Sequence, residues 1–349
     1  MTRPILEVDA LERRFDVSAP WLNRVLERKP RRTLRAVDGV DFDIMPGQTL
    51  ALVGESGCGK STIAKLVTGL HAPSGGKIRF NGDPEKMQMI FQDPFASLNP
   101  RWRVGRIVAE PLRTLHPETP DAQVTARVEE LLRTVGLSGA DAAKFPHEFS
   151  GGQRQRISIA RALAGEPEFL VCDEPTSALD VSVQAQVLNL MKKLQREMGL
   201  TYLFISHDLS MVRHIADRVA VMYLGKIVEL APRDALYDAP LHPYTQALLS
   251  AVPEPDPSLE ARTERIILKG DVPSPAKPPK GCNFCTRCPQ VMDICRQTAP
   301  VYREVSPGRF TACHLQDGHT PQTQQQQAPD AGQPAPARRH EQNQQGEDK

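Results

Sequence analysis

Residues 50–62 read Leu50-Ala51-Leu52-Val53-Gly54-Glu55-Ser56-Gly57-Cys58-Gly59-Lys60-Ser61-Thr62, and this stretch decides the fold. Four apolar residues predict a buried strand, which a glycine-rich loop follows directly before a helical segment that reaches Leu70. The loop has two glycines that flank four residues and precede Lys and Ser, a pattern that cradles phosphates. Its glycines let backbone N–H groups turn toward phosphate oxygens, since no Cβ blocks the approach.

The loop is therefore expected to bind the phosphates of ATP. Lys60 should reach the β- and γ-phosphates, the Ser61 hydroxyl should bind Mg²⁺, and the helix that begins near Lys60 adds the positive end of its dipole. Cys58 lies at this helix N-terminus, which should favour its thiolate, whereas Cys172 lies in a buried strand and is expected to be inert. The residues expected to hold the nucleotide here are Gly54, Ser56, Gly57, Cys58, Gly59, Lys60, Ser61 and Thr62.

Further strands and helices alternate along the chain. Residues 169–172 and 202–205 are expected as buried strands, and residues 184–198 and 209–216 as helices. This alternation predicts an α/β fold whose mostly parallel sheet is covered on both faces. Residues 5–15 are expected as an edge strand and residues 41–44 as another strand. Residues 104–137 are expected to be helical, as part of a helical subdomain that spans about 93–165.

An acidic pair follows the strand at 169–172. Asp173 comes directly after buried residues, so it is expected near the phosphates, where it would hold Mg²⁺ as a Walker B aspartate does. Glu174 stands at the exposed end of the strand, where a carboxylate can polarise the attacking water. The pair is followed by Pro175-Thr176-Ser177-Ala178-Leu179-Asp180. This context makes it a stronger signal than an isolated Asp-Glu pair, which is commonly just solvated.

The bulk composition excludes several functions. The 349 residues include 43 Lys and Arg against 42 Asp and Glu, so no global field favours nucleic acid. No apolar run approaches the roughly 20 residues that cross a bilayer, and the N-terminus lacks the apolar core of a signal peptide. We therefore expect the chain to reside in the cytosol. Residues 18–35 form a basic insert of unassigned role, expected as a surface helix or a contact to nucleotide, lipid or partner.

Phe149-Ser150-Gly151-Gly152-Gln153 resembles the signature motif of ATP-binding cassette (ABC) proteins, although Phe149 stands where the family more often has Leu. The resemblance implies that Ser150, Gly151, Gly152 and Gln153 bind the γ-phosphate held by a second subunit. Gln92 resembles the Q-loop glutamine that touches Mg²⁺, Asp180 belongs to a D-loop-like stretch, and His207 resembles the switch histidine. Phe15 is the best match to the aromatic residue that stacks on adenine, and Trp21 is a weaker one.

Within the ABC family the chain is similar to oligopeptide and dipeptide importer ATPases. The similarity lies in residues 54–60, 91–100, 179–186 and 242–249. It implies an ATPase at the cytoplasmic face of the inner membrane, with a paralogous second ATPase, two transmembrane permease subunits and an extracytoplasmic solute-binding protein. Import of nickel or another small solute stays open. A soluble cassette acting on ribosomes or DNA, a regulator that scarcely hydrolyses ATP, and an exporter are weaker alternatives.

The similarity also sets the expected organisation. The ABC domain spans 1–252, a C-terminal extension spans 253–315, and a disordered Gln/Pro-rich tail spans 316–349, since its composition cannot bury enough apolar surface. Relatives are thought to hold an iron–sulfur cluster with cysteines of the extension, which implies a [4Fe-4S] cluster on Cys282, Cys288, Cys295 and Cys313. Four thiolates suit zinc as well as iron, and Cys285 is an extra sulfur. Iron–sulfur, zinc and no metal all remain open.

Overall fold

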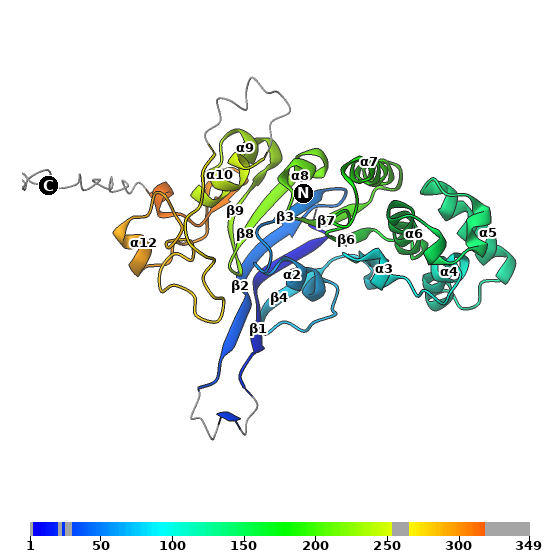
Figure 1. Cartoon of the computed structure of the whole chain (residues 1–349), viewed down its shortest axis with the longest axis horizontal. Helices are drawn as coiled ribbons and strands as arrows, with labels where there is room; N and C mark the ends of the chain where they lie inside the picture. Colours follow the sequence, from blue (N-terminus) through cyan, green and yellow to red (C-terminus); the bar gives the residue numbers. More distant parts are fainter. Residues whose placement is uncertain (1–2, 20–22, 25–29, 253–264, 318–349) are drawn as a thin grey trace, which may run out of the picture.

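The computed structural model describes residues 3–19, 23–24, 30–252 and 265–317 (Figure 1). Trp21, much of the basic insert and nearly all of the expected tail lie outside the described residues. None of the helices in the described part of the chain has both the length and the apolar character needed to cross a bilayer. The described elements form two sheets and the helices that pack around them.

The main sheet carries the expected parallel strands. Its described strand order is β10-β11-β9-β8-β3-β7-β6-β5, and the neighbours from β8 to β5 are parallel. The remaining neighbours, β8 to β10, are antiparallel, so the C-terminal extension adds its hairpin to the sheet of the ABC domain. The strands are β3 (Thr49–Val53), β5 (Met87–Ile90), β6 (Phe169–Asp173), β7 (Thr201–Ser206), β8 (Arg218–Tyr223), β9 (Lys226–Pro232), β10 (Arg303–Ser306) and β11 (Arg309–Thr311).

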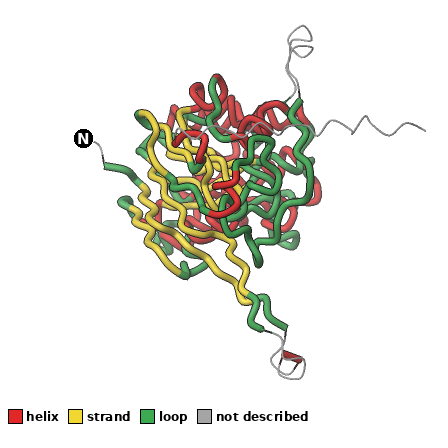
Figure 2. The backbone as a smooth tube through the Cα atoms, turned by 90° about the vertical axis from the view of Figure 1, so that its left-hand side faces the viewer, coloured by secondary structure: helices red, strands yellow, loops and turns green. Residues whose placement is uncertain are grey.

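A smaller antiparallel sheet corrects the prediction for residues 5–15. Strand β1 (Leu6–Asp16) lies between β2 (Thr33–Ile44) and β4 (Gly75–Phe80), so it is the central strand of three and not an edge strand. Its alternating burial arises because one face of this sheet packs on the core and the other faces solvent. Figure 2 shows the β1–β2 ribbon reaching beyond the body of the molecule.

Helices cover the main sheet and form a separate group beside it (Figure 1). The expected helical stretch 104–137 is broken into two helices, since Pro120 precedes the second one. Their buried residues include the expected seam of Val128, Leu131, Leu132 and Val135. The helices are α2 (Lys60–Val67), α3 (Pro94–Ser97), α4 (Val104–Leu115), α5 (Asp121–Thr134), α6 (Gly151–Ala164), α7 (Val181–Met198), α8 (Leu209–Ile215), α9 (Arg233–Asp238), α10 (Pro243–Ser250) and α12 (Asp293–Gln297).

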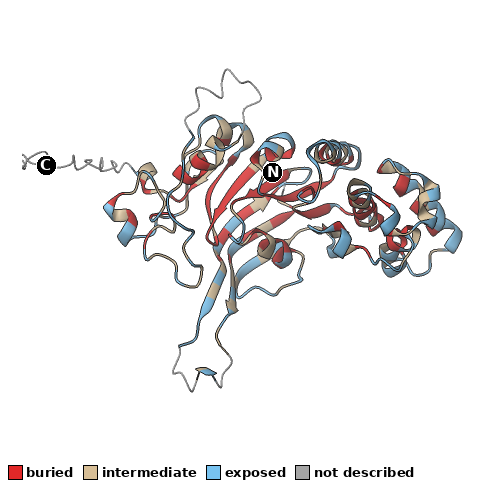
Figure 3. Ribbon diagram, in the orientation of Figure 1, coloured by how far each residue is buried: buried red, intermediate tan, exposed pale blue. Residues whose placement is uncertain are grey.

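Strands β3, β6 and β7 are buried at every residue and therefore on both faces (Figure 3). Leu50 and Leu52 of β3 pack on the core shared with α2 and the small sheet. Ala51 and Val53 of the same strand pack on the opposite core, which continues into the helical group. Successive side chains of a strand point to opposite faces, so the uninterrupted apolar run Leu50–Val53 is what a sheet covered on both faces requires.

Replacing Leu52 with Ala tests the packing of the strand that leads into the phosphate loop. Leu52 is 1% exposed, so the substitution should lower the free energy of unfolding by about 2–5 kcal/mol through lost burial and a residual cavity. Chemical denaturation followed by circular dichroism measures the difference. Leu70→Ala, at a position that is 56% exposed, is the matched control. Equal losses in the two variants would contradict the placement of β3.

Candidate active site

The glycine-rich loop between β3 and α2 is seated tightly against neighbouring backbone. A Cβ on Gly54, whose φ is +148°, would lie 2.2 Å from the carbonyl oxygen of Met222. A Cβ on Gly59, whose φ is +113°, would lie 2.2 Å from the carbonyl oxygen of Ala36. Any side chain at either position would displace the loop, because backbone oxygens cannot move aside cheaply. The path of the loop is therefore fixed by β8 on one side and β2 on the other.

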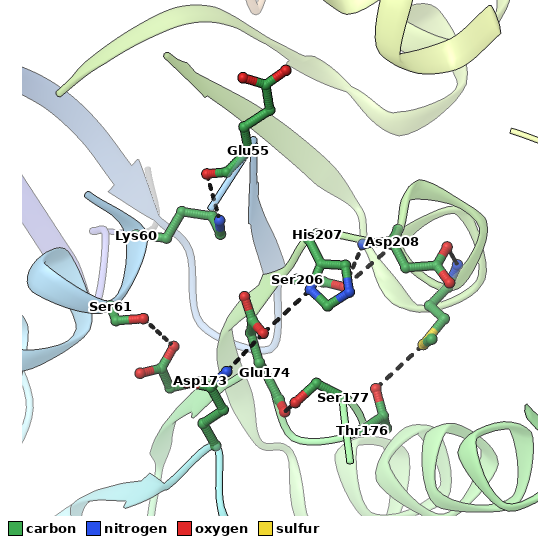
Figure 4. A network of polar contacts seen from close by, with 12 residues as sticks. Glu55, Lys60, Ser61, Asp173, Glu174, Thr176, Ser177, Ser206, His207 and Asp208 are labelled. Atoms are coloured by element: carbon green, nitrogen blue, oxygen red, sulfur yellow. Dashed lines mark hydrogen bonds and ion pairs between the residues drawn. The ribbon is translucent and has the colours of Figure 1, made fainter. Parts of the chain in front are cut away.

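Lys60 and Ser61 begin helix α2 and line the same cavity, and their polar groups bond to different partners there (Figure 4). The Lys60 ammonium donates hydrogen bonds to the carbonyl oxygens of Gly54, at 2.7 Å, and of Glu55, at 3.1 Å. The Ser61 hydroxyl donates to Oδ1 of Asp173, at 2.9 Å. Burial raises the pKa of Asp173, and the hydrogen bond from Ser61 opposes that rise. The expected phosphate and Mg²⁺ residues thus converge.

Glu174 lies at the end of β6 and is held from three sides. Its amide donates to the carbonyl of Ile205, at 3.0 Å. Its carboxylate Oε2 accepts a hydrogen bond from Nε2 of Gln92, at 3.0 Å, and lies 3.2 Å from Nδ1 of His207 (Figure 4). Glu174 has a φ of +46°, a conformation that costs a non-glycine residue energy and is concentrated at functional sites.

These residues surround a cavity of about 530 Å³, which is within the size range of small-molecule sites. Phe15 lies at the same cavity, and the Arg13 guanidinium is 4.6 Å from the centre of its ring. Of the expected site residues, the cavity brings together Phe15, Ser56, Gly57, Gly59, Lys60, Ser61, Thr62, Gln92, Glu174 and His207. Asp173 reaches the site through its hydrogen bond to Ser61.

The donor groups present fit a magnesium-bound triphosphate. Mg²⁺ prefers oxygen ligands, and the Ser61 hydroxyl and the Asp173 carboxylate supply oxygens in mutual contact. The Lys60 ammonium and the N-terminus of α2 supply positive charge for the phosphates beside them. Gly57 has a φ of +79°, and a Cβ there would meet open space, so the loop backbone is accessible at this residue.

The other expected nucleotide residues do not line this cavity. Gly54 and Cys58 are buried within the loop, and Asp180 occupies the N-cap position of α7 without a side-chain capping hydrogen bond. Ser150 caps α6 in the helical group, where it accepts a hydrogen bond from the Gln153 amide while the Gln153 side chain accepts one from the Ser150 amide. Gly151 and Gly152 form the first turn of this helix. Phe149, the departure from the signature pattern, is 5% exposed and packs within the helical group.

Comparison with known proteins identifies the family of the chain. A family model described as ABC transporter matches residues 37–177, and one described as the C-terminal region of oligopeptide/dipeptide transporters matches residues 228–295. The oligopeptide transport ATP-binding protein AppF of Bacillus subtilis is 51% identical over 325 residues, which cover 89% of this chain and 97% of AppF. The chain belongs to the oligopeptide transport branch of the ABC ATPase family. The resemblance that the motifs indicated is thereby confirmed.

Two further comparisons support the assignment of this ABC ATPase. The oligopeptide transport ATP-binding protein OppF of Escherichia coli is 54% identical over 286 residues, which cover 78% of this chain and 86% of OppF. A dimeric ATP-binding cassette, solved in a post-hydrolysis state with ADP and Pi, matches with a TM-score of 0.57 and 25% identity. That match covers 65% of this chain and 98% of the solved one, and it confirms the predicted ABC fold.

Cys58 of this ABC ATPase differs from the sequence-based expectation. Burial raises the pKa of its thiol, although the Lys60 charge acts in the opposite direction. Its side chain is 6% exposed and lies beneath the loop, so the charged form would lose hydration. The expected thiolate is therefore wrong, because desolvation outweighs the helix N-terminus. The expectation for Cys172 agrees with its complete burial, which also raises the pKa of that thiol.

The expected metal centre in the extension finds no support among the described residues. Across the described ranges, no group of three or more His, Cys, Asp or Glu side chains is placed to hold a metal ion. Cys282, Cys288, Cys295 and Cys313 are free thiols, as is Cys285. Burial raises the pKa of Cys282 and of Cys288 to about 12 and that of Cys313 to about 11. We therefore derive no chemistry through an iron–sulfur cluster or zinc.

The cavity also has walls that the motifs did not indicate. Leu34, Arg35 and Ala36 come from β2, Gly225 comes from the turn after β8, and Pro275 comes from the C-terminal extension. The Arg35 amide approaches the Pro275 carbonyl at 3.4 Å, which joins two of these segments. Gly225 could have been recognised in the sequence as a turn residue. The contact between Arg35 and Pro275 could not, because residues more than 200 positions apart leave no local sequence pattern. The extension is thus part of the wall of this cavity.

Alkylation of Cys58 tests the corrected thiol chemistry. At pH 7.5 the native chain should react with iodoacetamide at Cys58 about tenfold or more slowly than the urea-unfolded chain, because the raised pKa and burial leave little thiolate. The rate should still be rising above pH 9. Mass spectrometry of the Cys58 peptide follows the reaction, with the same peptide from unfolded chain as control. A native rate that levels off below pH 7 would restore the thiolate interpretation.

Proposed function

We propose that this chain hydrolyses ATP and thereby energises the import of dipeptides and oligopeptides by a membrane complex. The observation that carries the proposal is the convergence of Lys60, Ser61, Asp173, Glu174 and His207 at one cavity in a chain of this family. Relatives at 51% and 54% identity are named oligopeptide transport ATP-binding proteins. The match to the C-terminal region of peptide transporters supports the same solute class.

The hydrolytic step is assigned to Glu174. Its carboxylate lies at the cavity and is oriented by Gln92 and His207, so it can accept a proton from a water that attacks the γ-phosphate. Lys60 would move from the loop carbonyls to the phosphate oxygens and offset their charge. Ser61, Asp173 and Gln92 would hold Mg²⁺, which neutralises charge on the phosphates when bound. Phe15 is proposed to stack on adenine.

The signature residues are proposed to act on a neighbouring subunit. Ser150, Gly151, Gly152 and Gln153 do not line the cavity of their own chain, and Figure 1 shows α6 in the helical group, apart from α2. The N-terminus of α6 presents free N–H groups, which suit an anion. A second ABC ATPase, most simply a paralogue, would bring its own signature to this cavity, with Asp180 near the contact. The solved relative with ADP and Pi is itself a dimer.

An apolar groove offers a docking place for the permease. It has a volume of about 870 Å³ and lies between the connection after α2, strand β5 and helix α4. Leu70 and Phe91 line it with 56% and 38% of their surfaces exposed, and Phe91 directly precedes Gln92. Two permease subunits would dock here at the cytoplasmic face of the membrane. A solute-binding protein on the other side would act through them, and a displacement at Phe91 would reach Gln92 next to it.

Replacing Glu174 with Gln tests the proposed function. The variant should bind MgATP with unchanged affinity but lower kcat by about 10²–10⁴-fold, because the amide cannot take the proton from water. In cells that lack this chain, the wild type should restore uptake of labelled di- and tripeptides, and Glu174→Gln should not. Glu197→Gln, on the surface of α7, is the control. Hydrolysis near the wild-type rate would refute the base assignment, and peptide uptake that persists without the chain would refute the solute class.

A further inference from the structure

The C-terminal extension touches the phosphate loop directly through Arg287. Nη1 of its guanidinium donates a hydrogen bond to Oε2 of Glu55, at 2.8 Å, and Nη2 donates one to Oε1, at 3.1 Å. Glu55 is the second residue of the loop, between Gly54 and Ser56. The Arg287 side chain is 10% exposed and the Glu55 side chain 30%, so the pair is largely shielded from water. Two parallel hydrogen bonds of this kind fix orientation as well as charge.

The backbone of Glu55 is held as firmly as its carboxylate. Its amide donates to the hydroxyl of Tyr244, at 2.9 Å, and its carbonyl accepts the bond from Lys60. Figure 4 shows the Glu55 carboxylate pointing away from Lys60, whose ammonium lies at the backbone carbonyl. Glu55 thus joins Arg287 on the outer side of the loop to Lys60 on the phosphate side.

Asn283, four residues before Arg287, links the extension to the loop a second time. The Asn283 amide donates to the carbonyl of Leu224, at 3.2 Å, and the next residue, Gly225, donates its own amide to the Cys58 carbonyl in the loop. Residues 283–287 therefore contact the loop directly at Glu55, and Asn283 is linked to Cys58 through Leu224 and Gly225.

An aromatic cluster of Phe284, Tyr223 and Tyr244 anchors the segment that carries Arg287. Phe284 packs edge-on against Tyr223, with ring centres 5.2 Å apart, and tilted against Tyr244, at 5.4 Å. Phe284 is 1% exposed, so the segment that carries Arg287 is anchored in the core. The hydrogen bonds that Arg287 donates to Glu55 raise the pKa of Arg287 further above its ordinary value, so its charge is permanent.

The negative charge of Glu55 would repel the phosphates of ATP, and Arg287 offsets that repulsion. A carboxylate inside a loop that binds triphosphate places like charges close together, and such juxtaposition is costly when water is excluded. Arg287 does not line the nucleotide cavity, so it acts on the site through Glu55 and not on the nucleotide. Its paired hydrogen bonds compensate the carboxylate and turn it away from the phosphates.

We propose that Arg287 is a positioning residue for ATP binding, which neutralises Glu55 and fixes the phosphate loop from the C-terminal extension. The inference rests on the proposed ATPase function and deepens it, since it makes the extension a working part of the nucleotide site. Loss of Arg287 leaves an uncompensated carboxylate beside the phosphates. Loss of both charges removes that repulsion, so the second substitution should rescue the first.

The test compares MgATP dissociation constants of the full-length wild type, Arg287→Gln, Glu55→Gln and the double variant. Arg287→Gln should weaken MgATP binding about tenfold and, when the ATPase is assayed with a second cassette subunit present, raise KM more than it lowers kcat. The double variant should return to within about threefold of the wild type, and the defect of Arg287→Gln should shrink at high salt, which screens the repulsion. Arg303→Gln, which breaks a pair with Asp317 elsewhere in the extension, is the control and should bind normally.

The outcomes separate the proposals. A wild type that binds no MgATP would refute the ATPase function itself. A wild type that binds, with Arg287→Gln equally tight or with a double variant as weak as Arg287→Gln, would overturn the role of Arg287. Thermal unfolding of each variant shows whether it folds. If Arg287→Gln does not fold, Arg287→Lys carries the test: it keeps the charge without the paired bonds, so about threefold weaker binding is expected and unchanged binding overturns the proposal.

Discussion

The parallel register of three neighbouring strands is the constraint on which the site depends. Strand β3 pairs with β7 up to Val53 and Ser206, and β7 pairs with β6 up to Ile205 and Asp173. Because the carboxyl ends of parallel strands meet at one edge of a sheet, the residues just after each strand are brought to the same place. The phosphate loop comes after β3, Glu174 after β6 and His207 after β7. A slip of one residue would reverse the faces of a strand and separate these groups.

Much of this half of the site could be predicted from sequence, because each part has a local signal. The run Leu50 to Val53 is apolar throughout, glycines mark the loop that follows it, and Asp173 ends another apolar run. Signals of that kind depend on neighbouring residues alone. They gave the parallel sheet and the two cores, and they located the loop and its acidic partners.

Other features depend on distant residues and could not be predicted in the same way. The central position of β1 requires pairing with β4, about 65 residues further along the chain. The Cys58 thiol is governed by burial under the loop and not by its place at a helix N-terminus. The pair of Glu55 and Arg287 spans 232 residues, and neither residue has an unusual local pattern. The role proposed for Ser150 comes from the family resemblance, because local physics alone would not assign it.

Under the proposed function, one chain supplies the phosphate side of the nucleotide site, and the signature loop of a second subunit would close the other side. The most direct test is the ATPase rate per molecule of this chain, measured at fixed low concentration while a second cassette subunit of the complex is titrated in. The rate should rise from near zero and saturate as dimers form, and replacing the signature serine of the added subunit with Ala should abolish the rise. A full rate in a strictly monomeric preparation would contradict the account.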